Sequence, residues 1–104
     1  MILHEKSCKS FPDGTAPLNE KEITDYITKV SSGWQVFEGK RIKKEFPFKN
    51  FKQSMAFAQM VALVAEKEDH HPDMCIHYGS VEIELTTHSI GGLSENDFIV
   101  AAKI

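Results

Sequence analysis

Cysteine and long apolar runs are scarce in this sequence of 104 residues. The two cysteines, Cys8 and Cys75, do not make a disulfide framework, which favours a reducing, cytoplasmic setting. The longest apolar stretch, residues 55–65, includes a glutamine and is too short to cross a bilayer. The N-terminus lacks the apolar core and cleavage site of a signal peptide. We therefore expect a protein without a membrane segment.

Basic charge is equally sparse. No Lys/Arg run exceeds two residues and the net charge is −3, so the basic patch typical of nucleic-acid binding is missing and no direct nucleic-acid contact is expected. The composition, with 41% hydrophobic and 26% charged residues, is that of a globular protein, and the length fits one domain. We assign residues 1–17 to an N-terminal loop and residues 18–104 to a single domain.

Capping patterns mark the starts of three helices, because Asn or Ser is followed three residues later by Glu, Gln or Asp. The predicted helices begin at Asn19, Asn50 and Ser94. Gly33 is expected to close the first helix, and the third is expected to end at Lys103.

Strand-like segments between the helices form two predicted hairpins. Their strands cover residues 34–37, 42–48, 74–78 and 81–87. Glu38-Gly39-Lys40 and Gly79-Ser80 supply the turns, and alternation along the last strand places His88 on its polar face. The order of elements predicts an α+β fold, a two-layer sandwich in which a four-stranded antiparallel sheet carries helices on one face.

The predicted helix over residues 50–69 has no polar face along part of its length, because ten of the eleven residues from 55 to 65 are apolar. It is either the central core helix or a subunit interface. A two-layer domain of this size covers only one side of such a helix, which favours self-association through it, as a homodimer or a homotetramer.

Four of the five histidines fall between positions 70 and 88. His70 is expected at the C-terminal end of the long helix, one turn after Glu66, where the helix dipole and the carboxylate both favour the imidazolium form. An imidazolium donates a proton readily near neutral pH. A simple helix cap is the alternative for a lone histidine, but Pro72 forces His70 and His71 to splay at a turn that can line a cleft.

Other residues could complete such a site. His88 has the hydroxyls of Thr86 and Thr87 as neighbours, while Asp97 is either a helix cap or a carboxylate near the site. Metal coordination would need His70, His71 and His88 to converge with Asp97 or Cys75. Adjacent histidines point in different directions and no metal-binding spacing is present, so we predict no metal and no cofactor.

Four motifs together resemble the signature of the pterin-4a-carbinolamine dehydratase family, whose members are also described as dimerisation cofactors of a homeodomain transcription factor. They are residues 65–72 with His70-His71-Pro72, then Tyr78, then Thr86-Thr87-His88, and residues 92–97 with Ser94 and Asp97. The resemblance covers nearly everything from Leu18 onward. Met74 departs from it, because the family commonly has an aromatic residue at that position.

The resemblance implies dehydration of 4a-hydroxytetrahydrobiopterin to quinonoid dihydrobiopterin by a tetramer built through the long helix. It implies catalysis by His70, His71 and His88, with Glu66 and Asp97 as supporting acids. The pterin contacts it implies are Asp69, His70, His71, Thr86, Thr87, His88 and Ser89.

Two questions stay open at this stage. His70 is expected to act as the acid, His88 as the base or its exchangeable partner, and His71 to orient the pterin. The alternative function is a non-enzymatic binding module that stabilises dimers of a transcription factor, which would add a nuclear location to the cytoplasmic one.

Overall fold

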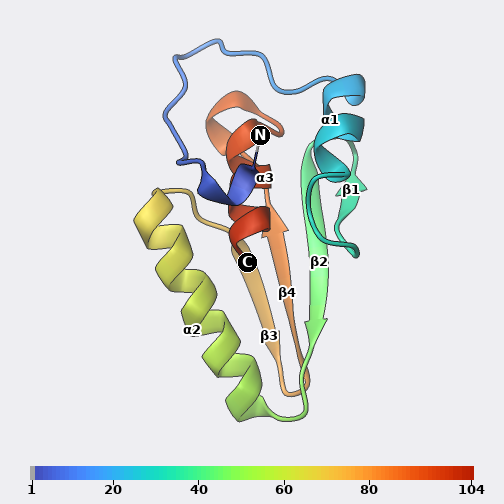
Figure 1. The fold of residues 1–104 in the computed structure, drawn as a ribbon, viewed down its shortest axis with the longest axis vertical. Helices are drawn as coiled ribbons and strands as arrows, with labels where there is room; N and C mark the ends of the chain where they lie inside the picture. Colours follow the sequence, from blue (N-terminus) through green and yellow to red (C-terminus); the bar gives the residue numbers. More distant parts are fainter. Residues whose placement is uncertain (1) are drawn as a thin grey trace.

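The computed structural model describes residues 2–104 as an antiparallel sheet with α-helices packed on one face (Figure 1). The strands are β1 (Gln35–Phe37), β2 (Arg41–Pro47), β3 (Asp73–His77) and β4 (Ser80–Leu85), in the order β1-β2-β4-β3. The helices are α1 (Glu20–Ile27), α2 (Phe51–Glu68) and α3 (Glu95–Lys103), with 3-10 turns η1 (Leu3–Glu5) and η2 (His88–Ile90). The predicted α+β two-layer sandwich is confirmed.

Two hairpins build the sheet and join through their inner strands, with Ile42 of β2 opposite Leu85 of β4. The first hairpin turns through Glu38 and Gly39, both at positive φ (55° and 67°), which is the conformation that suits the twist of a tight hairpin. The second turns through Tyr78-Gly79, because His77 pairs with Ser80. The predicted Gly79-Ser80 turn was therefore one residue too late.

The core lies between the sheet and the helices. Along β4 the side chains of Val81, Ile83 and Leu85 are fully buried, while the intervening glutamates are only half-buried. The alternation follows from the two-residue period of a strand, and it gives the sheet one apolar face under the helices and one charged face. On the charged face Lys43 pairs with Glu84 at 3.2 Å.

The three predicted helix starts are confirmed, since Asn19, Asn50 and Ser94 are the N-cap residues of α1, α2 and α3. The predicted end of the first helix at Gly33 is wrong, because α1 ends at Ile27. The residues that follow are mainly Thr, Val and Ser, which have low helix propensity. No helix within residues 2–104 is long and apolar enough to span a membrane.

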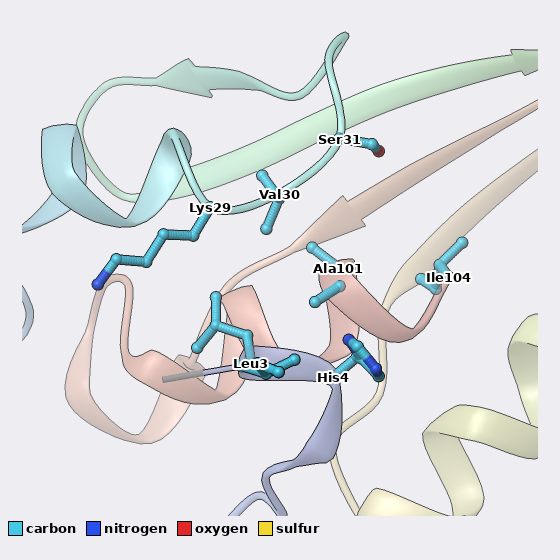
Figure 2. Close-up of a pocket in the computed structure, with 9 residues that line it drawn as sticks. Leu3, His4, Lys29, Val30, Ser31, Ala101 and Ile104 are labelled. Atoms are coloured by element: carbon cyan, nitrogen blue, oxygen red, sulfur yellow. The ribbon is translucent and has the colours of Figure 1, made fainter.

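The N-terminal segment packs against the domain. Leu3 in η1 is only 3% exposed and belongs to the core. In the close-up of Figure 2, η1 faces the end of α3 and the loop at Lys29–Ser31. These segments bound a cavity of about 430 Å³, which none of the predicted site residues lines. The histidine cluster therefore lies outside this cavity.

Core burial at the sheet can be tested with two matched substitutions. Ile83→Ala should lower the free energy of unfolding by about 3 kcal/mol, because it removes buried methyl groups and leaves a cavity. Val36→Ala on the edge strand β1, at a side chain that is 37% exposed, should cost less than half as much. Urea denaturation measures both, and equal losses would contradict the core described here.

Candidate active site

The end of α2 delivers the histidines. Asp69 caps the helix in the left-handed conformation (φ 51°, ψ 40°), and the His70 amide donates back to the carbonyl of Ala65 at 3.2 Å. These bonds satisfy carbonyls that the helix end would leave unpaired. With Pro72 close behind, the chain turns sharply, and His70 lies just past the helix as predicted.

His70 contacts a buried carboxylate. Its Nε2 lies 2.6 Å from Oδ1 of Asp97, a carboxylate with no exposed surface. The other oxygen of Asp97 accepts from the Ser94 amide at 2.9 Å, which closes the capping box of α3. Asp97 therefore both caps a helix and contacts a histidine, while its role in the site stays a prediction.

This pairing determines which ring nitrogen of His70 remains available. Nε2 of His70 is the donor of this bond when the Asp97 carboxylate is ionised, because an ionised carboxylate only accepts hydrogen bonds. Nδ1 is then left to take up or release a proton. A hydrogen bond to one ring nitrogen commonly sets the role of the other in this way.

Thr87 holds the same carboxylate from the sheet. Its hydroxyl donates to Oδ2 of Asp97 at 2.8 Å and lies 2.7 Å from the Ser94 hydroxyl, and the residue is only 6% exposed. Thr87 was predicted as a pterin contact, whereas its side chain is committed to Asp97. The sequence prediction assigned Ser94 only a capping role, although its box with Asp97 was the signal for this network.

Glu66 pairs with a different histidine from the one predicted. Its carboxylate contacts Nε2 of His71, and both side chains are more than half exposed. The predicted Glu66–His70 pair is wrong. The left-handed turn at Asp69 directs His70 toward α3 and leaves His71 beside the last turn of α2.

His88 lies past the end of its predicted strand. Strand β4 ends at Leu85, and His88 begins η2 with an exposed side chain. A single bridge between Thr87 and Gly92 replaces further pairing, so the placement of His88 on a strand face is wrong. The predicted contact Ser89 is exposed in the same turn.

A shallow hollow of about 250 Å³ adjoins His88 on the charged face of the sheet. Thr86, Glu84 and Arg41 also line it. The Thr86 hydroxyl donates to the carbonyl of Lys40 at 2.6 Å, which ties the end of β4 to the first hairpin. Arg41 and Glu84 were not among the predicted site residues, and nothing in their sequence context marks them.

The two groups of predicted residues meet at one edge of the sheet. Asp73 lies opposite Glu84 in the antiparallel pair, so the residues before β3 run beside those after Glu84. Asp97 completes the junction by contacting both His70 and Thr87, the neighbour of His88. Asp69 and His71 remain exposed at the rim.

The histidines of this edge do not gather at one point. Within residues 2–104, no three His, Cys, Asp or Glu side chains are grouped so that they could hold a metal ion. Two imidazoles, one linked to Thr87 through Asp97 and the other on the next residue, suit a reaction in which one atom of a substrate gains a proton and another loses one.

The N-terminal segment reaches the rear of this site. The Cys8 amide donates to Oε1 of Glu68 at 2.8 Å, and Lys103 pairs with the same carboxylate at 3.1 Å. The Cys8 hydrogen bond, followed by Lys103, lowers the pKa of Glu68 despite its burial. Burial, with the charges of Glu68 and Asp97, raises the pKa of the Cys8 thiol to about 12, so this thiol stays protonated at neutral pH.

Comparison with known protein families gives one consistent result. Residues 16–104 match the family model described as pterin 4 alpha carbinolamine dehydratase. Relatives from Nitrosomonas eutropha and Nitrosospira multiformis are 47% and 50% identical over 98% of this chain, covering 89% and 88% of their own lengths. Both carry the name pterin-4-alpha-carbinolamine dehydratase as a provisional assignment.

Solved structures show the same fold. A Brucella melitensis protein described as a transcriptional coactivator/pterin dehydratase is 38% identical, with a TM-score of 0.77 over 84% of this chain and 93% of its own. A pterin dehydratase-like protein described as a RuBisCO assembly factor of the alpha-carboxysome has a TM-score of 0.54 over 68% of this chain and 89% of its own. At 22% identity, the second supports the fold alone.

The lowered pKa of Glu68 predicts an acid-dependent loss of stability. A carboxylate with a lowered folded-state pKa stabilises the fold above its unfolded value, about 4.3, and that contribution is lost as the pH falls through the folded value. Glu68→Gln should therefore be less stable than wild type at pH 7, and the difference should shrink below about pH 4.3. Glu66→Gln, at an exposed carboxylate, is the control. Urea denaturation across pH tests this, and a constant difference would contradict it.

Proposed function

Because the chain belongs to the pterin-4a-carbinolamine dehydratase family, we propose that it dehydrates 4a-hydroxytetrahydrobiopterin to quinonoid dihydrobiopterin in tetrahydrobiopterin recycling. The observation that carries the proposal is the buried His70–Asp97 pair, which Thr87 links to the position of His88. This arrangement supplies two imidazoles at one sheet edge, one of them held in a defined orientation.

The reaction is a proton-balanced elimination. The bond from C4a to its hydroxyl oxygen breaks as that oxygen takes a proton and leaves as water. A ring N–H gives up its proton, and its electron pair forms the new carbon–nitrogen double bond. No net oxidation occurs, so one acid and one base suffice, and imidazoles serve both roles near neutral pH.

In this proposal His70 is the acid. The buried carboxylate of Asp97 stabilises the imidazolium, and its bond to Nε2 leaves Nδ1–H free to protonate the leaving oxygen. His88 takes the ring proton, or exchanges roles with His70, because its exposed side chain can reach a bound ligand. His71, held by Glu66, orients the pterin.

The pterin would lie against the sheet edge between these histidines. Asp69 to His71 border it from the end of α2, and Thr86 to Ser89 border it from the end of β4. Thr87 would contact it through the backbone only, because its hydroxyl is bonded to Asp97. Asp97 is thus a positioning residue, as is Thr87.

The mechanism is tested by the turnover of chemically generated 4a-hydroxytetrahydropterin after exhaustive chelation. Absorbance follows the dehydration. His70→Ala and His88→Ala should each lower kcat by about 10²- to 10⁴-fold, the usual contribution of a general acid or base. The double variant should lose less than the product of the two losses if the residues act as a unit. His77→Ala, at an exposed histidine on β3, should keep wild-type turnover.

Three outcomes would count against this mechanism. Strictly multiplicative losses would contradict joint action of His70 and His88. Activity abolished by chelation would contradict a metal-free reaction. A well-folded wild type that does not accelerate dehydration over buffer would refute the enzymatic proposal.

Self-association through α2 is part of the proposal. Leu63 is 73% exposed and Met60 is 40% exposed on this helix, and Ile76 on the adjacent edge strand is 38% exposed. Apolar side chains gathered on neighbouring elements commonly mark a protein interface. The same surface also suits a helical protein partner, and the Brucella relative is described as a coactivator as well as a dehydratase. A binding role is therefore the second candidate function.

Leu63→Glu should shift the protein to smaller species, because a charge would be buried without a partner at the interface. Size-exclusion chromatography with light scattering measures the mass, and Thr24→Glu at an exposed position of α1 is the control. A monomeric wild type would contradict self-association. Exchange of subunits with a helical partner would favour the binding role.

A further inference from the structure

The N-terminal segment is bound to both helix ends that form the site. The Cys8 amide donates to Glu68 at the end of α2. Lys9 makes two hydrogen bonds with the Asn96 side chain at the start of α3. The Lys9 amide donates to Oδ1 at 3.1 Å, and Nδ2 donates to the Lys9 carbonyl at 2.7 Å. Lys6 adds an ion pair with Glu95 at 2.9 Å. We call residues 6–9 the strap.

The anchors of the strap are sequence neighbours of the central pair. Glu68 lies two residues before His70, and Asn96 directly precedes Asp97. Both anchor side chains are buried, and the bonds that they make to the strap are partly buried. The strap therefore binds both of the backbone segments that carry His70 and Asp97.

The strap also lies close to the pair, through the residues next to it. Asp97 is fully buried, and its charge is near enough to raise the pKa of the half-buried Cys8 thiol. A cavity of about 150 Å³ is lined by residues 8–10 on one side and by Glu68 and Asp69 on the other. The end of the strap therefore lies near Asp69, one of the predicted pterin contacts. The Cys8 thiol lies 3.6 Å from the carbonyl of Asn96, the residue that precedes Asp97.

We propose that the strap is a positioning element of the active site, which through Glu68 and Asn96 keeps the His70–Asp97 hydrogen bond aligned and dry. A hydrogen bond to a charged group is stronger where water is excluded, so admitting water weakens it and loosens the imidazole. For turnover the proposal rests on the dehydratase function, whereas its structural part does not. A strap that only added stability would leave this bond unchanged.

Asn96→Ala is the decisive variant. It removes both side-chain bonds to Lys9 but keeps the backbone of α3. The matched control is Asn50→Ala, which removes a helix cap at the opposite end of α2 and lowers stability without touching the strap. Isotope-labelled histidine allows solvent exchange of the His70 ring N–H to be followed by NMR in each full-length protein. Amide exchange at Cys8 and Lys9 reports whether the strap has detached.

In Asn96→Ala the His70 ring proton should exchange about 30-fold faster, the ratio that corresponds to the loss of two ordinary hydrogen bonds. Its kcat should fall while KM stays near the wild-type value, and Asn50→Ala should change neither exchange nor kcat. The proposal is overturned if the strap detaches while His70 exchange stays at the wild-type rate. It is overturned equally if Asn50→Ala produces the same changes. An inactive wild type would refute the dehydratase function and still leave the exchange measurement decisive.

Discussion

The hydrogen bond between His70 and Asp97 is the interaction on which the rest of the site depends. It joins the end of α2 to the start of α3, and Asp97 extends the connection to the sheet through Thr87. One buried carboxylate accepts from a helix amide, a hydroxyl and an imidazole, so three of its roughly four acceptor sites are used. Burial of a charge is tolerated only when it is satisfied in this way, and the same satisfaction fixes the histidine.

The sheet and the helix ends each determine a different part of the geometry of the site. The register of β3 and β4 determines which residues before β3 lie beside which residues after β4. That register is set by which face of the sheet is buried. The helix ends then set direction, because the left-handed Asp69 sends His70 and His71 to different partners. The result is one largely buried histidine, His70, and two exposed ones, His71 and His88.

Local patterns in the sequence predicted the fold well. Alternation along β4 and the caps at Asn19, Asn50 and Ser94 each depend on a few neighbouring residues, and the structure confirms them. The pairing of Glu66 could not be predicted from spacing on a helix, because one residue past the helix adopts a left-handed conformation and redirects the chain. Likewise, the roles of Thr87 and of the N-terminal segment depend on contacts between distant parts of the chain. The assignment of substrate contacts and catalytic roles stays a prediction.

The strap contacts join residues that are far apart in sequence: 60 positions separate Cys8 from Glu68, and 87 separate Lys9 from Asn96. Contacts of such long sequence separation form late, because a large loop must close before they add any stability. During synthesis on the ribosome, the N-terminal segment and the first hairpin emerge long before α3 is available to bind them. The nascent chain therefore presents His70 before its partner Asp97 has been synthesised, and the His70–Asp97 contact can form only once the start of α3 has emerged.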